Sequence, residues 1–142
     1  MTLPGGCLCG AVRYTASAAP GMQGLCFCAD CRKASGSAFI PFMGFDAATI
    51  VFTGETRRHV AMSARGTDAV RNFCPTCGGL VFGGIPGVDD NHTIYAGSLD
   101  DPSAFRPTIA IFTADRPTWA PLPDGLTQFA GLPGPESMGE QT

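Results

Sequence analysis

The chain has 142 residues, which fits one domain, and its hydrophobic fraction of 44% is enough to build a core. Its net charge is −3 and Lys33 is its only lysine, which argues against a general binder of nucleic-acid phosphates. Because residues 1–6 show no leader-like basic or apolar segment, and no apolar run approaches roughly 18 residues, we expect a cytoplasmic protein with no membrane or nucleic-acid partner.

Short strand-like segments follow one another along most of the chain. They are rich in Val, Ile, Phe, Tyr and Thr, and Gly, Pro, Asp or Ser residues bound them. The segments predicted as strands are 11–16, 23–28, 38–45, 49–52, 56–62, 69–74, 80–83, 92–96 and 108–112. This pattern predicts a mainly β domain built from antiparallel sheets.

Helical periodicity is confined to two short turns. They are predicted at residues 29–35 and at 101–105, where Asp100 is placed to cap the turn and Pro102 lies early in it. Residues 131–142 show neither a strand nor a helix pattern. We therefore expect a single domain over residues 1–130 and a flexible C-terminal tail over residues 131–142.

The seven cysteines fall into three tight clusters. Cysteines one or two residues apart rarely form a relaxed disulfide, but a short turn can direct two thiolates at one metal ion. The first cluster is Cys7 and Cys9, the second is Cys26, Cys28 and Cys31, and the third is Cys74 and Cys77. In a reducing compartment such clusters indicate metal binding more often than disulfides.

The first and third clusters together predict one closed zinc site with four thiolate ligands. Cys74 and Cys77 flank a Pro-Thr turn that two glycines follow, which is typical of a zinc knuckle whose backbone N–H groups approach the sulfurs. Four buried cysteines without a metal are the plain alternative. An iron site of the rubredoxin kind is a further alternative.

The middle cluster supplies three ligands and leaves one coordination position open, which is typical of a catalytic zinc site. Cys26 and Cys28 project from one face of a strand, because strand side chains alternate, and Cys31 returns from the turn. A substrate thiol would enter the open position as a thiolate. In the alternative, His59 or His92 supplies a fourth ligand and the site is closed and structural.

Two cations follow the middle cluster directly along the chain, Arg32 and Lys33. Three thiolates give a bound zinc ion a net negative charge. We therefore predict that one or both cations offset this charge or attract an anionic substrate. A solvated turn is the alternative interpretation of both residues.

The order of the three cysteine motifs resembles the glutathione-dependent formaldehyde-activating enzyme family, which includes centromere protein V. The motifs are CLCGAVRY at residues 7–14, CFCADCRKASGSAF at 26–39 and FCPTCGG at 73–79. A later segment, WAPLPDGLTQF at 119–129, is similar to the family's C-terminal pattern. The resemblance therefore covers about residues 4–130.

The resemblance implies a β-tent of small antiparallel sheets organised around zinc. It implies structural zinc ligands at Cys7, Cys9, Cys74 and Cys77, and ligands of a second, catalytic zinc at Cys26, Cys28 and Cys31. The implied activity forms S-hydroxymethylglutathione from glutathione and formaldehyde, formally a carbon–sulfur lyase reaction. Where many members have histidine between the first two cysteines of the second site, this chain has Phe27, which removes a possible proton carrier.

Two functions follow from these features. The first is a zinc-dependent carbon–sulfur lyase, or thiol-adduct enzyme, which binds glutathione or a related small thiol at the open three-cysteine zinc. The second is a non-catalytic two-zinc scaffold or binding protein, which Phe27 and the lack of a placed acid or base favour.

Overall fold

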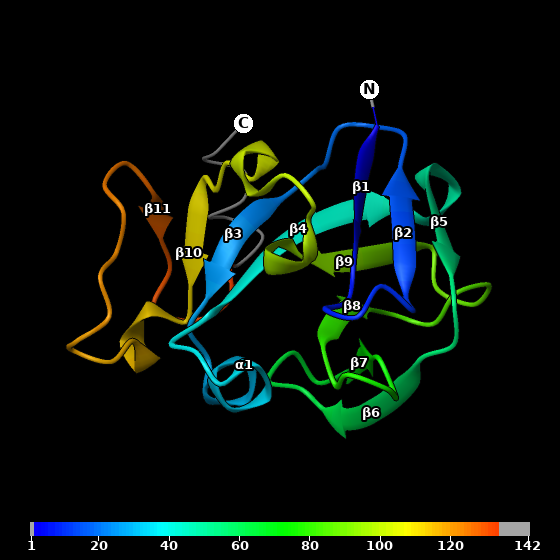
Figure 1. The fold of residues 1–142 in the computed structure, drawn as a ribbon. Helices are drawn as coiled ribbons and strands as arrows, with labels where there is room; N and C mark the ends of the chain where they lie inside the picture. Colours follow the sequence, from blue (N-terminus) through cyan, green and yellow to red (C-terminus); the bar gives the residue numbers. More distant parts are fainter. Residues whose placement is uncertain (1, 134–142) are drawn as a thin grey trace.

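The structure is a computed structural model that describes residues 2–133, and its strands form two sheets (Figure 1). The smaller sheet has three antiparallel strands in the order β1-β2-β5. These strands are β1 (Leu3–Gly6), β2 (Arg13–Ala16) and β5 (Ile50–Thr53). In Figure 1, β1 and β2 run across the direction of the long strands of the larger sheet.

The larger sheet has eight strands in the order β11-β10-β3-β4-β9-β8-β7-β6. The strands are β3 (Gln23–Cys26), β4 (Ile40–Asp46), β6 (Arg57–Met62), β7 (Asp68–Phe73), β8 (Leu80–Gly83), β9 (Asn91–Tyr95), β10 (Ile109–Ile111) and β11 (Thr127–Gln128). Neighbouring strands are antiparallel, except that β10 pairs in parallel with both β3 and β11. The prediction of a mainly β fold with small sheets is confirmed, and each predicted strand is present with ends that differ by at most two residues.

The helical turns are short, and the only α-helix among residues 2–133 is α1 (Ala29–Ser35). Its bounds are those predicted from the sequence. The 3₁₀ turns are η1 (Ala47–Thr49), η2 (Ala96–Ser98), η3 (Pro102–Ala104) and η4 (Thr113–Asp115).

The cap of η3 differs from the prediction. Asp101, not Asp100, accepts the backbone N–H of Ser103 at the start of this turn. Asp100 instead forms an ion pair with the guanidinium of Arg13 on β2. The aspartate one position later is the cap because its side chain reaches the free N–H of the first turn.

Two hydrophobic clusters make up the core. The larger one joins the two sheets and contains Val12 and Tyr14 from the side of the small sheet, with Met43, Phe82 and Ile94 from the large sheet. The second cluster lies around Phe27 and includes Leu25, Ala38, Ala110 and Ala120. The segment that carries the middle cysteines therefore runs beside the second cluster.

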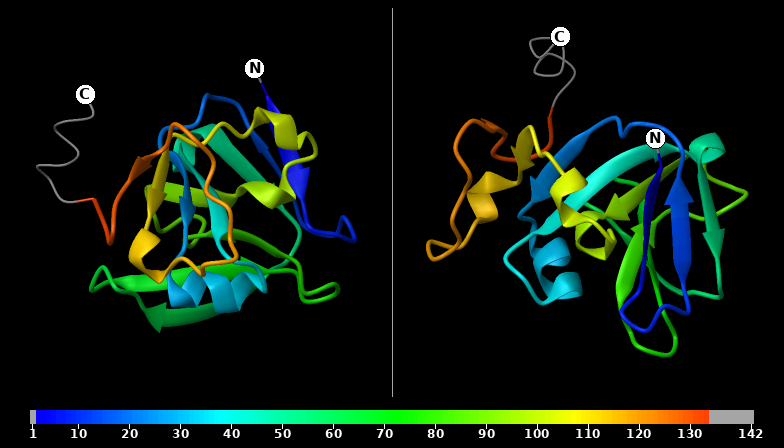
Figure 2. Two further views of the ribbon diagram at one scale, coloured as in Figure 1. Left: turned by 90° about the vertical axis from the view of Figure 1, so that its left-hand side faces the viewer. Right: turned by 45° about the horizontal axis from the view of Figure 1, so that its top comes forward.

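The helix α1 lies beside the hairpin of β6 and β7, which both views of Figure 2 show. No helix within residues 2–133 is both long enough and apolar enough to span a membrane. Residues 134–142, most of the predicted flexible tail, lie outside the described residues.

Candidate metal centres

The first and third cysteine clusters come together in space. Cys7 and Cys9 lie in the loop between β1 and β2, and Cys74 and Cys77 lie in the turn between β7 and β8. The four sulfurs lie within 4.8 Å of one another, and Cys9 Sγ is 3.7 Å from the sulfurs of both Cys7 and Cys74. Tetrahedral zinc with Zn–S bonds of about 2.3 Å places its sulfurs roughly 3.8 Å apart. The spacing therefore fits one tetrahedral metal ion.

Backbone N–H groups surround the sulfurs of this four-cysteine cluster. Val12 donates to Cys7 Sγ at 3.2 Å and Thr76 donates to Cys74 Sγ at 3.4 Å. Hydrogen bonds from the backbone of Cys9 and Gly79 lower the pKa of Cys77 to about 6. Such donors stabilise thiolates, which are the form that binds a metal.

The middle cysteines converge at the junction between β3 and α1. Cys26 ends β3, Cys28 is the N-cap residue of α1, and Cys31 lies in its first turn. The three sulfurs lie within 4.8 Å of one another, and Cys28 Sγ accepts the backbone N–H of Cys31 at 3.3 Å. Hydrogen bonds from the Cys26 and Cys31 thiols lower the pKa of Cys28 to about 2, and the same contacts raise the pKa of Cys26. These contacts favour a thiolate within the three-cysteine cluster, which is the form that binds a metal.

Neither histidine joins the three sulfurs. Among residues 2–133, no His, Asp or Glu side chain lies with them as a further ligand. His92 is buried, its Nδ1 is 3.1 Å from the carbonyl oxygen of Gly83, and its ring packs edge-on against Phe52 and Phe82. His59 is exposed on β6. The interpretation of the cluster as a closed site with a histidine ligand therefore finds no support in the geometry.

Phe27 points away from the sulfurs on either side of it. Its side chain is fully buried in the second hydrophobic cluster, and its ring centroid is 5.3 Å from that of Phe39. The alternation of side chains along the segment explains this, since Cys26 and Cys28 face one way and Phe27 the other. A proton carrier at this position would therefore lie in the core.

Arg71 is a residue of the site that the sequence did not indicate. It lies on β7, and its Nη2 atom is 3.8 Å from Cys31 Sγ. Partial burial disfavours the charged guanidinium, but the contact with Cys31 favours it. The second effect is larger, and the pKa of Arg71 is raised. The two residues are 40 positions apart, so no local spacing could have linked them. Arg71 places a permanent positive charge beside the three-cysteine cluster.

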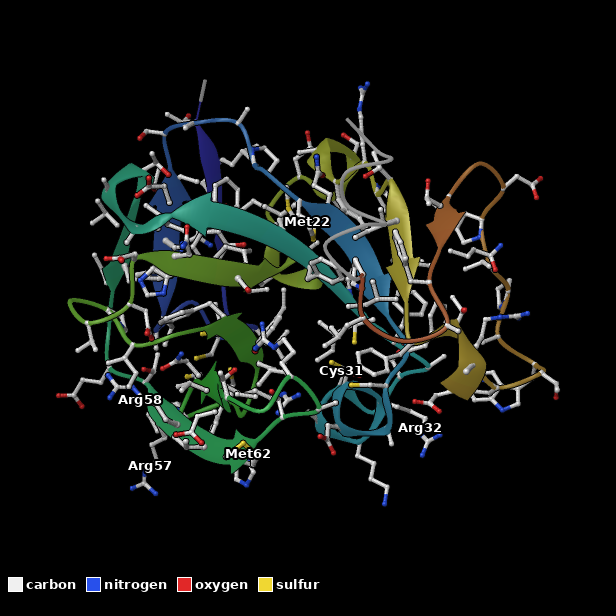
Figure 3. All side chains as sticks on the ribbon, turned by 180° about the vertical axis from the view of Figure 1, so that it is seen from behind. Met22, Cys31, Arg32, Arg57, Arg58 and Met62 are labelled. Carbon is white, nitrogen blue, oxygen red and sulfur yellow. The ribbon has the colours of Figure 1, made fainter. Side chains whose placement is uncertain are left out.

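A pocket of about 390 Å³ lies between α1 and the β6–β7 hairpin. Its polar lining consists of Asp30, Lys33, His59 and Arg71, and we call this hollow the basic pocket. Lys33, one of the two cations predicted to offset the charge of the site or attract substrate, lies in the lining of this pocket. Arg32 is not among the lining residues, and Figure 3 shows it on the side of α1 away from Arg57.

The fold and the two convergent thiol clusters define a β protein with two candidate metal centres. The family model of the glutathione-dependent formaldehyde-activating enzymes matches residues 2–115, and the chain belongs to this family. A crystal structure of a Rhodobacter sphaeroides protein, a structural genomics target, matches the fold with a TM-score of 0.51 and 20% sequence identity. That match covers 68% of this chain and 87% of the other chain. No curated protein sequence matches the chain.

Proposed function

We propose that the protein is a zinc-dependent carbon–sulfur lyase that forms or cleaves the adduct between formaldehyde and glutathione or a related thiol. The observation that carries this proposal is the three-cysteine cluster, which gathers three thiols without a fourth ligand among the described residues. An incomplete ligand set of this kind is typical of catalytic zinc sites. Membership of the formaldehyde-activating family supports the same chemistry.

The residues present fit two zinc ions. Cys7, Cys9, Cys74 and Cys77 would hold a structural zinc, and Cys26, Cys28 and Cys31 would hold a second one. A zinc ion bound by the three thiolates supplies an open coordination position and a positive charge that favours the thiolate form of a thiol.

The protein's own side chains would stabilise charge and orient the substrate. The guanidinium of Arg71, next to Cys31 Sγ, offsets the negative charge that gathers on the sulfurs. In the reaction the thiol sulfur forms a bond to the carbonyl carbon of formaldehyde, and the proton lost by the thiol ends on the new hydroxyl group. Because Phe27 faces the core, a group that moves this proton would have to lie on the pocket side, where Asp30 and His59 are the titratable candidates.

The variant Cys28→Ser tests this function. A native mass spectrum of the wild type should show two zinc ions and one bound glutathione, whereas the variant should retain one zinc ion and bind no glutathione. Lyase turnover should fall at least about 100-fold, since the variant loses a ligand of the reacting centre. Ser37→Ala, an exposed position just after α1, is the control and should behave as the wild type. Full activity in Cys28→Ser would refute the mechanism.

The second candidate is a two-zinc scaffold that binds partners without catalysis. It is favoured by Phe27, which is buried in the second hydrophobic cluster and supplies no acid or base at its position between Cys26 and Cys28. Two bound zinc ions, together with no glutathione adduct and no turnover in the wild type, would support the scaffold over the enzyme.

A further inference from the structure

The basic pocket has more positive than negative side chains in its lining, although the chain as a whole is acidic. The only lysine, Lys33, lines it from α1, and Arg71 and His59 line it from the β6–β7 hairpin. Asp30 is the only acidic residue in its lining, whereas the whole chain has a net charge of −3. We infer that the basic pocket binds a carboxylate group of the thiol substrate, an inference that rests on the proposed function.

The two permanent cations of the pocket carry no carboxylate partner in residues 2–133. Within residues 2–133, the ion pair joins Arg13 to Asp100, and neither of these residues lines the pocket. Asp30 shares the lining with Lys33 and Arg71 but forms an ion pair with neither. Lys33 is exposed, and Arg71 directs one of its nitrogens at Cys31 Sγ, so both cations can still donate hydrogen bonds to an anionic ligand.

Arg71 is suited to hold a carboxylate and the thiolate cluster together. A guanidinium has five N–H donors in a planar fork, and one of its nitrogens is directed at Cys31 Sγ. The remaining donors can bind a carboxylate through two parallel hydrogen bonds. Because Arg71 both contacts Cys31 and lines the pocket, a ligand in the pocket lies close to the three sulfurs.

The rest of the lining fits the uncharged part of such a substrate. Ala34, Ala61, Phe73 and Leu80 give the pocket apolar walls. A volume of about 390 Å³ lies within the range of small-molecule sites, roughly 300–1,000 Å³. The favoured substrate is therefore a small thiol that carries a carboxylate a few bonds from its sulfur, such as a thiol peptide, and not a neutral or cationic thiol.

Calorimetric titration of the zinc-loaded full chain with S-methylglutathione tests the inference. This probe keeps both carboxylates of glutathione but has no free thiol. We expect Arg71→Gln to weaken its binding about 10- to 100-fold and Lys33→Gln to weaken it by a smaller factor. Both effects should vanish with the dimethyl ester of the same probe, because the ester removes the charge that the cations recognise.

Arg57→Gln is the matched control. Arg57 is exposed on β6, on the same hairpin as Arg71, but it does not line the pocket. Its replacement should leave binding of the probe unchanged. Circular dichroism and zinc content establish that each variant is folded, and Lys33→Gln, at an exposed position, carries the test if Arg71→Gln does not fold.

The outcomes separate this inference from the proposed function. Equal binding of the acid and the ester, or equal weakening in Arg57→Gln, would overturn the carboxylate assignment. Inorganic phosphate that displaces the probe at lower concentration than acetate would do the same, since it would indicate a phosphate site. Because the probe has no thiol, carboxylate-dependent binding without any lyase turnover counts against the proposed function alone.

Discussion

At the scale of single residues, Phe27 shows how one segment serves the core and the site at once. Cys26 and Cys28 direct their sulfurs toward Cys31, while the ring between them is fully buried against Phe39. Phe27 therefore contributes apolar area to the second cluster, on the side of the segment away from the sulfurs.

Tyr14 carries a pH dependence of stability. Its side chain is 2% exposed, and its hydroxyl lies 2.8 Å from Ser98 Oγ. Burial, which disfavours the phenolate, raises the pKa of Tyr14 to about 12. A pKa raised by folding gives stability that is complete below the unfolded value of about 10 and is lost as the pH rises toward 12.

We therefore predict an alkaline loss of stability that depends on Tyr14. Between pH 9 and pH 11 the free energy of unfolding should fall about 1 kcal/mol further in the wild type than in Tyr14→Phe. Urea unfolding at the two pH values measures the difference, and the thiols titrate in both proteins and so cancel. An equal fall in both proteins would show that Tyr14 does not titrate in this range.

At the scale of elements, α1 is the part of the fold on which both proposals depend. Its N-cap is Cys28, whose sulfur takes the place of the usual oxygen as acceptor, and its C-cap is Gly36, with φ of 67°. The backbone N–H of Gly36 donates to the carbonyl oxygen of Arg32 at 3.0 Å. This left-handed end suits glycine, because other residues suffer a steric penalty there.

Gly36→Ala should destabilise the protein by about 1 kcal/mol through the backbone alone. A Cβ at this position would meet no atom within 4 Å, so no clash adds to the penalty. Gly36→Asn should cost less, since asparagine tolerates this conformation better. Urea unfolding and zinc content check both variants, and Ser37→Ala is the control. Unchanged stability in Gly36→Ala would contradict the argument.

Secondary structure could be predicted where the side-chain pattern was strong. The strands β4 and β9 and the helix α1 have clear patterns or turn signals. Strand β1 has the sequence LPGG, whose proline and glycines carry no strand signal. It forms because it pairs with β2, and because Gly5 leaves room for the Tyr14 hydroxyl. Such strands depend on tertiary pairing and could not be predicted locally.

At the scale of the whole molecule, part of the candidate site could be predicted from the sequence and part of it could not. The cysteine clusters could be predicted because metal ligands recur at short, recognisable spacings. Their grouping into four and three sulfurs agrees with the geometry. Arg71 and His59 could not be predicted as neighbours of α1, because β7 and β6 lie four and five positions from β3 in the large sheet and only the tertiary fold brings their hairpin beside the helix.

The four-cysteine cluster brings the loop after β1 to the turn after β7, so a metal ion bound there should stabilise the whole domain. We predict that Cys77→Ser lowers the free energy of unfolding by at least about 3 kcal/mol, or the melting temperature by roughly 10 °C. Thermal unfolding followed by circular dichroism measures the effect. Cys28→Ser, which alters the three-cysteine cluster, should cost less. A larger loss in Cys28→Ser would reverse the structural and catalytic assignments.

The parallel pairing of β3 with β10 also limits when the large sheet can be completed during synthesis of the chain. Cys26 ends a strand that lacks one neighbour until Ile111, its partner on β10, has left the ribosome. The roughly 85 residues between them take on the order of 4–17 s to translate at about 5–20 residues per second. For that interval β3 keeps one unpaired edge, so the sheet beside the three-cysteine cluster is complete only after β10 has been translated.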